Sequence, residues 1–187
     1  MIDKALDFLR YELDLYLQDR AKVPPEKVVL DTLASSTGNS QSAENVVYLT
    51  LANMEEERMG KAQTPYPIDY PNTRAATEPV VKLNLFVLFA PHYRDFKESL
   101  KMLYYTVAFF QGRPVFTPET YSRLDSRIEK IMLDLYSPTF EQQNHLWGYL
   151  GAKYLPSALY RLRLLVIDDG QTGEDIPPVN EVLVDLE

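Results

Sequence analysis

The hydrophobic positions near the start of the chain recur at steps of three and four residues, the spacing of one face of an α-helix. Charged residues, including Asp7 and Asp14, fall elsewhere around the same helical wheel. Pro24 and Pro25 cannot continue a helix. The pattern predicts an N-terminal helix with one apolar stripe, formed by Ile2, Leu6, Leu9, Leu13, Tyr16 and Leu17.

Other segments have the period-two alternation or the β-rich composition of strands. In the last of them, Tyr160 and Leu162 share one side, while Arg161 and Arg163 share the other. In the one before it, Ile131, Leu133 and Leu135 share a side. The predicted strands are residues 27–33, 45–53, 80–90, 127–136 and 159–167.

Two further helices are predicted between these strands. Residues 94–111 keep helical spacing, and Gly112 with Pro114 ends that element. Its apolar stripe, expected to pack on the sheet, consists of Phe96, Leu100, Leu103, Tyr104, Val107 and Phe110. Residues 138–150 follow Ser137, which we expect to cap a helix, and end before Gly151. The predicted fold is α+β, with a mainly antiparallel central sheet packed by three helices.

The same pattern divides the chain into one domain and two contact segments. Residues 1–168 suit a single domain, interrupted by a proline-rich loop or arm at residues 55–79. Structureless connections of this length are uncommon in compact domains and are usually functional. Residues 169–187 carry acidic side chains, no lysine or arginine, and apolar residues such as Val182 and Val184. We therefore predict an acidic arm that docks on a neighbouring subunit.

Composition narrows the possible partners. The 187 residues carry a formal net charge of −8, which gives no electrostatic reason to bind nucleic acid. Cysteine is absent, so disulfides and thiolate chemistry are excluded. Neither a Sec-type signal peptide nor a transmembrane helix is expected from the hydropathy pattern.

Candidate catalytic chemistry is sparse. The two histidines, His92 and His145, do not form a spacing that places two metal ligands on one helical face. Phosphate-binding loops and nucleophile elbows have no matching motif. We therefore predict a protein that is not an enzyme and that needs neither cofactor nor metal ion.

Several residues are instead candidates for subunit contacts. A run of three glutamates followed by Arg58 is predicted to form an acidic edge that pairs with a basic edge of the next subunit. Three consecutive carboxylates point in different directions, which disfavours a metal site. Arg113 and Trp147 are interface anchors by residue type, although a core position for Trp147 is an equal alternative. The candidate pairing residues are Glu55, Glu56 and Glu57 with Arg161 and Arg163.

Six stretches of the chain, taken in order, resemble a known family. They are MIDKALDFL at 1–9, LANMEEE at 51–57, LNLFVLFA at 83–90, FFQGRPVFT at 109–117, and LWGYLGAKYLPS at 146–157 running into YRLR at 160–163. The family is that of the cap proteins of extracellular contractile injection systems of the antifeeding-prophage and virulence-cassette type. It is similar to phage tail terminators.

The resemblance implies a structural protein without catalytic residues. It implies a ring, expected to be hexameric, that binds the inner tube protein and the sheath protein and ends their assembly. It also implies assembly in the cytoplasm and a final place in an injection particle. Two alternatives stay open: a tube–sheath adaptor or other tail component near the baseplate, and a small-ligand-binding domain or enzyme that uses residues 55–79 as a lid.

Overall fold

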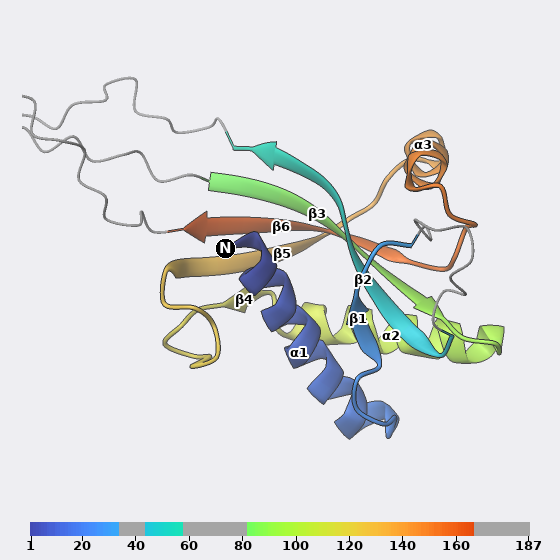
Figure 1. The fold of residues 1–187 in the computed structure, drawn as a ribbon, viewed down its shortest axis with the longest axis horizontal. Coiled ribbons are helices and arrows are strands. Elements are labelled where there is room, and N and C mark those ends of the chain that lie inside the picture. The colour runs from blue at the N-terminus through green and yellow to red at the C-terminus, as the bar shows by residue number, and fades with distance from the viewer. Residues whose placement is uncertain (34–43, 58–81, 167–187) are drawn as a thin grey trace, which may run out of the picture.

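A computed structural model describes residues 1–33, 44–57 and 82–166 of the chain. This part folds as an α+β domain, as the sequence predicts, with a six-stranded sheet and three helices (Figure 1). In chain order the elements are α1 (Ile2–Ala21), β1 (Val28–Leu30), β2 (Val46–Glu56), β3 (Lys82–His92), α2 (Phe96–Gly112), β4 (Val115–Phe116), β5 (Ile128–Tyr136), α3 (Phe140–Leu150) and β6 (Ala158–Val166).

The strands lie in the order β1-β2-β3-β6-β5-β4. Among the described strands, only β1 and β2 pair in parallel, and the other four pairs are antiparallel. The central pairs β2–β3, β3–β6 and β5–β6 are long, whereas the outer strands β1 and β4 are short. Much of each sheet edge therefore carries no further strand within the described residues.

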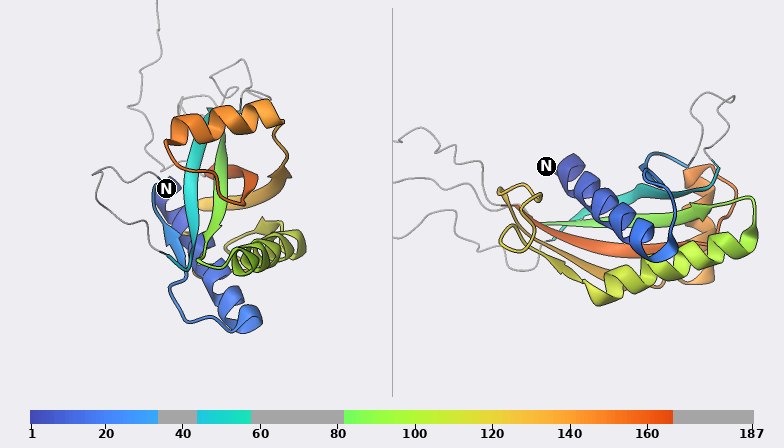
Figure 2. Two further views of the ribbon diagram at one scale, coloured as in Figure 1. Left: turned by 90° about the vertical axis from the view of Figure 1, so that its right-hand side faces the viewer. Right: turned by 90° about the horizontal axis from the view of Figure 1, so that it is seen from below.

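The two faces of the sheet have different coverings. Helices α1 and α2 lie on one face, which we call the core face, and α3 crosses one end of the other, which we call the outer face (Figure 2). The main hydrophobic core lies beneath α1 and α2. Its members from the sheet alternate along the strands, as the sequence predicts; they include Val47, Leu49, Leu85, Val87, Phe89, Ile131, Leu133, Leu162 and Leu164.

Helix α1 follows the predicted apolar stripe, but one of its charged residues is buried. Leu9, Leu13 and Leu17 are fully buried, and Asp14 is only 6% exposed. The Asp14 carboxylate accepts backbone hydrogen bonds from Glu26 at 3.0 Å, Lys27 at 2.7 Å and Val28 at 3.0 Å. It also accepts a side-chain hydrogen bond from Gln18 at 2.7 Å. Because these donors satisfy the carboxylate, a buried acid here fixes the turn that leads from α1 into β1.

Helix α2 is present where predicted but buries a different stripe. The side chains that face the interior are Ser99, Met102, Thr106, Phe109 and Phe110, of which only Phe110 belongs to the predicted set. The polar members are satisfied there: Thr106 Oγ1 donates to the Met102 carbonyl at 2.9 Å, and Ser99 Oγ accepts from the Tyr93 amide at 3.1 Å. Small polar residues can face a core when their hydroxyls bond to nearby backbone. Of the other predicted residues, Leu103 and Val107 are half-buried against the core, whereas Phe96, Leu100 and Tyr104 are exposed.

Helices α2 and α3 each begin two residues later than the sequence predicts. Asp95 caps α2 by accepting a hydrogen bond from the Lys97 amide at 3.0 Å, so that helix begins at Phe96. Thr139, not Ser137, caps α3, since Thr139 and Gln142 form a reciprocal capping box. Gly151 ends α3 in the left-handed conformation with φ 64°, as expected of a C-cap glycine.

Strand β2 extends to Glu56, so the proline-rich arm begins later than predicted. Glu55 and Glu56 belong to β2, where they pair with Asn84 and Leu83 of β3, so the proline-rich arm begins after them. The pairing of β2 with β3 continues past a register shift between Leu51 and Asn53. The remainder of the arm, from residue 58, and the predicted acidic arm at 169–187 lie outside the described residues.

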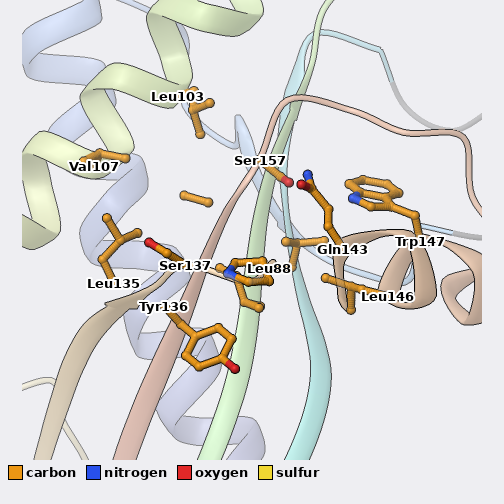
Figure 3. A pocket seen from close by; sticks show the side chains of 13 residues that line it. Leu88, Leu103, Val107, Leu135, Tyr136, Ser137, Gln143, Leu146, Trp147 and Ser157 are labelled. Atoms are coloured by element: carbon orange, nitrogen blue, oxygen red, sulfur yellow. The ribbon is translucent and has the colours of Figure 1, made fainter. Parts of the chain in front are cut away.

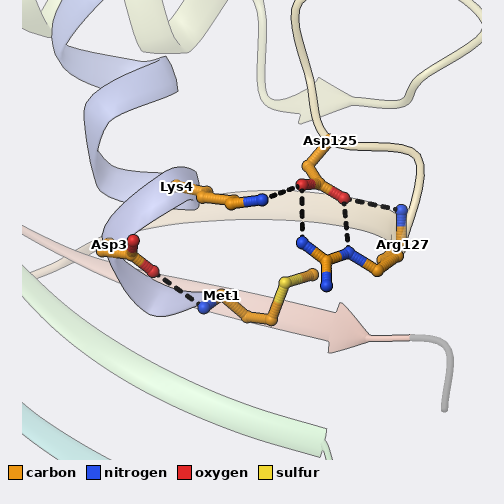
Figure 4. Close-up of polar contacts among 5 residues, drawn as sticks. All are labelled: Met1, Asp3, Lys4, Asp125 and Arg127. Carbon is orange, nitrogen blue, oxygen red and sulfur yellow. Dashed lines mark hydrogen bonds and ion pairs between the residues drawn. The ribbon is translucent and has the colours of Figure 1, made fainter. Parts of the chain in front are cut away.

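Polar contacts join the N-terminus of α1 to the loop before β5 (Figure 4). The Asp125 carboxylate accepts hydrogen bonds from Lys4 at 2.6 Å and from the Arg127 guanidinium at 3.0 and 3.1 Å. The bonds from Arg127, and then that from Lys4, hold the pKa of Asp125 well below its usual range. The N-terminal amine bonds to Asp3 at 2.7 Å in the same turn. Residues 121 positions apart are thereby held together at the rim of the core face.

Candidate interface surfaces

Arg161 and Arg163 lie on the outer face of the sheet, opposite the buried Tyr160 and Leu162 on the same strand, as predicted. Between them they bind one carboxylate. Asp134 Oδ2 accepts from Arg163 Nη2 at 2.6 Å and from Arg161 Nη2 at 3.4 Å. The hydrogen bond from Arg163 is the main cause of the lowered pKa of Asp134. This cluster carries two positive charges for one negative charge on a half-exposed surface.

The acidic run lies at the end of β2, which is separated from β6 by β3 in the same sheet. Glu55 and Glu56 end β2 and are exposed, and the Glu57 amide donates to the Lys82 carbonyl at 2.9 Å. On the outer face, Glu55 pairs across the ladder with Asn84, and Asn84 pairs with Arg163. The acidic edge and the arginines are therefore on one sheet but separated by a strand. Arg58, Val182 and Val184 lie outside the described residues.

The two predicted anchors have different environments. Arg113 follows α2 and is exposed, with its guanidinium carbon 5.1 Å from the Phe109 ring centroid and 5.8 Å from that of Tyr16. Trp147 is 7% exposed and belongs to the smaller core between α3 and the outer face, which matches the alternative kept open for it. Its ring nitrogen is buried and has no hydrogen-bond partner among the residues that the structure describes. Interface roles for both residues stay predictions.

A cavity of about 340 Å³ opens where the chain passes from β5 to α3 (Figure 3). Leu103 and Val107 of α2 line it from one side, and Gln143 and Trp147 of α3 line it from the other. Leu135, at the end of β5, completes the apolar wall between the two helices. Leu88 of β3 and Leu159 of β6 also line the cavity, whose lining is mostly apolar with hydroxyl groups from two serines, Ser137 and Ser157.

Sequence reasoning missed that several large apolar side chains of α2, β5 and α3 are exposed. Phe140 is 92% exposed at the first position of α3, and Tyr104 and Phe96 of α2 are 68% and 62% exposed. Leu100 and Leu135 are also exposed. The spacing of four residues from Phe96 to Leu100 to Tyr104 was the available signal, but the sequence does not reveal which of two stripes on α2 faces the core.

Within the described ranges, no three His, Asp or Glu side chains gather as possible metal ligands. In the same part of the chain, no helix has both the length and the apolar character needed to span a membrane. The described residues do show paired arginines, an acidic strand end and exposed aromatic side chains.

Comparison with solved structures places the fold in a class. The chain is similar to the structure described as the PVC sheath/tube terminator in extended state of an extracellular contractile injection system, with a TM-score of 0.57 and 15% identity over 100% of this chain. It is also similar to the anti-feeding prophage cap, described as a tube terminating cap, with a TM-score of 0.52 and 12% identity over 94% of this chain. The fold is therefore of the tube-terminator class.

The family follows from the sequence itself. A family model described as the Pvc16 N-terminal domain matches residues 5–181, and the chain belongs to that family. The chain spans 62% and 60% of the lengths of the two similar structures. No curated protein matches it in sequence. The predicted family resemblance is confirmed.

Proposed function

We propose that this chain is a structural cap protein that ends the inner tube and the sheath of a contractile injection apparatus. The observation that carries the proposal is membership of the Pvc16 N-terminal domain family over residues 5–181, joined with the fold of tube-terminator structures. The terminator binds the growing end of the tube and offers no equivalent surface for another ring, so addition stops. No bond is made or broken in this mechanism.

The partners follow from the same proposal. The chain assembles with copies of itself as a ring, proposed to be hexameric, and contacts the inner tube protein and the sheath protein. Heterologous contacts close into a ring only when the rotation between subunits is right, and a rigid packed sheet holds that rotation constant. Assembly in the cytoplasm precedes incorporation into the particle. The arm after residue 57 and residues 169–187 are proposed to reach tube or sheath subunits.

Deletion of the gene from a strain that makes the particles tests the role. Tubes and sheaths of uncontrolled length are the expected result, because nothing would stop ring addition. Electron microscopy of purified particles measures the length distribution, and restoring the gene should restore the narrow distribution. Particles of normal length in the deletion strain would reject a terminator role.

The position of the chain separates the cap from the adaptor alternative. A tag on the chain should appear at the end of the particle far from the baseplate when imaged with a labelled antibody. A label confined to the baseplate end would favour the tube–sheath adaptor.

Truncation tests the proposed arm. Removing residues 176–187 should leave the circular dichroism spectrum and the thermal midpoint unchanged while reducing incorporation into particles. Unchanged incorporation would show that this segment makes no essential contact.

A further inference from the structure

The cavity between α2, β5 and α3 has an apolar side and a polar side (Figure 3). At about 340 Å³ it is near the lower end of the range for pockets that bind small molecules, about 300–1,000 Å³. Leu88 and Leu159 are buried and line it from the sheet, and the apolar wall continues through Leu103, Val107 and Leu135. The polar side chains that line the cavity are Ser137, Gln143, Trp147 and Ser157.

The polar side of the cavity is not satisfied by the described part of the chain. Trp147 is 7% exposed, and its buried ring nitrogen has no acceptor there. Gln143 is half-buried; its backbone amide donates to the Thr139 carbonyl at 2.8 Å, but its side-chain amide has no partner among the described residues. Buried polar groups are normally hydrogen-bonded, and an amide side chain can both donate and accept. This wall therefore has the capacity to bind a further polar group.

The lining also defines the charge of the molecule that fits. None of the described residues that line the cavity is a lysine, arginine, histidine, aspartate or glutamate. Glu141 and His145 of α3 are exposed and do not belong to the lining. A charged ligand would lose hydration here without meeting an opposite charge, so the lining favours a neutral one.

A neutral amide that carries a large apolar group matches both sides of the cavity. Its hydrocarbon part packs against the leucines and Val107, while its carbonyl and N–H groups meet the polar wall of Gln143 and Trp147. A peptide residue such as leucine has this chemistry, because each residue carries one backbone donor and one backbone acceptor. Leu135 and Ser137 of the lining are exposed, so the cavity can be reached without unfolding the domain.

We propose that the cavity binds one large aliphatic residue of a neutral peptide segment from a partner protein, with the peptide group of that residue facing Gln143 and Trp147. A side chain held in a desolvated pocket is the usual anchor of a protein interface. The source of the segment rests on the proposed function, because a structural component of a particle has other protein chains as its ligands. The chemistry of the segment rests on the lining alone.

Trp147 is the only tryptophan of the chain, so its ring N–H gives a single signal that reports on the cavity. In nitrogen-15 NMR spectra of the labelled full chain, N-acetyl-leucinamide should shift this signal saturably. N-acetyl-glycinamide has the same amide without the side chain and should bind at least about tenfold more weakly, because no leucine side chain is buried. A signal that shifts with neither compound, or equally with both, overturns the proposal.

Filling the cavity supplies an independent test of its apolar side. Val107→Phe and Ser157→Leu each add bulk to the lining and should weaken the binding of N-acetyl-leucinamide by about tenfold or more, because the leucine side chain can no longer be buried. The circular dichroism spectrum of each variant should stay that of the folded chain. Leu15→Phe, at an exposed leucine of α1 outside the lining, should leave binding unchanged. If both filled variants bind as the parent does, the proposal is wrong.

The polar side needs a variant of its own. Gln143→Leu keeps the approximate size of the side chain but removes its donor and its acceptor, and should weaken the binding of N-acetyl-leucinamide by about threefold to tenfold. Asn144→Leu, at the exposed neighbouring position of α3 outside the lining, should not weaken it. Equal effects of the two substitutions would show that the peptide group does not face this wall.

Incorporation into particles separates this inference from the proposed function. Val107→Phe and Ser157→Leu should each reduce incorporation of the full chain, whereas Leu15→Phe should not. If the parent is found at tube ends and both filled variants are incorporated equally well, the cavity holds no partner segment and the cap role stands. If the purified chain binds N-acetyl-leucinamide as predicted but is absent from tube ends, the peptide site stands and the cap role fails.

Discussion

The two faces of the sheet differ in how completely helices cover them and in how many apolar side chains they bury. On the core face, α1 and α2 bury leucine, valine and phenylalanine side chains completely. On the outer face, α3 covers one end with a smaller core, and half-exposed arginines occupy the other. The comparison indicates that the core face contributes most of the buried apolar area that holds the fold together, while the outer face keeps half-exposed charged side chains among the described residues.

Neighbouring phenylalanines of β3 give the strongest test of that difference. Phe89 is fully buried on the core face against Phe110 and Tyr160, whereas Phe86 packs on the outer face against Tyr136. Phe89→Ala should lower the free energy of unfolding by about 3–5 kcal/mol. Phe86→Ala should cost about 1 kcal/mol, near the average for single substitutions. Urea denaturation measures both, and equal losses would contradict the division between the faces.

The buried carboxylate of α1 tests how the core face is fixed at its edge. Asp14→Ala leaves three backbone amides without their acceptor and should lower the free energy of unfolding by about 1–3 kcal/mol. Asp19→Ala removes an exposed carboxylate from the same helix and serves as the control. Matching effects of the two substitutions in urea denaturation would mean that the hydrogen bonds of Asp14 add nothing.

The cap of α3 tests the layer on the outer face. Thr139→Ala removes one half of the capping box and should cost about 1 kcal/mol. Ser137→Ala, at the cap that the sequence suggested, should cost much less. Thermal unfolding compares the two variants, and a larger loss for Ser137→Ala would overturn the assignment of the cap.

The smallest expected effect is a change in how the free energy of unfolding depends on pH in the acid range. The pKa of Asp125 is lowered in the folded chain by hydrogen bonds from Arg127 and Lys4. A depressed pKa gives stability that is complete above the unfolded value of about 4 and is lost as the pH falls below it. Asp125→Asn should therefore flatten the loss of stability between about pH 4 and pH 2. The same slope in Asp125→Asn and in the parent would exclude this contribution.

The sequence pattern predicted an element correctly where a single rule, such as the period of a strand or a helix, decides its structure. Alternation along residues 45–53 and 159–167 predicted these two strands, because side chains in a strand point to opposite faces. The N-terminal stripe predicted α1, and Gly151 predicted the end of α3. The two-residue strand β4 was missed because it is too short to show any period.

The environment of the candidate interface residues was harder to predict from the sequence. Their charges and apolar character are visible in the sequence, but the pairing of Arg161 and Arg163 with Asp134 depends on the register of β5 and β6. From residue type alone, Trp147 could belong either to the core or to an interface. Its burial depends on α3 folding back over the outer face, which no local pattern encodes.

The sequence by itself determined the number and kind of the long elements, the family and the scarcity of catalytic groups, since these follow from local period, composition and motif. Only the tertiary structure decided which stripe of α2 is buried. That choice is made by the packing of α2 against α1 and β3. Ser99, Met102 and Thr106 face this contact, and the hydroxyls of Ser99 and Thr106 form hydrogen bonds with backbone groups. Phe96, Leu100 and Tyr104 are left outside because a helix that packs on one side can bury only one of its two stripes.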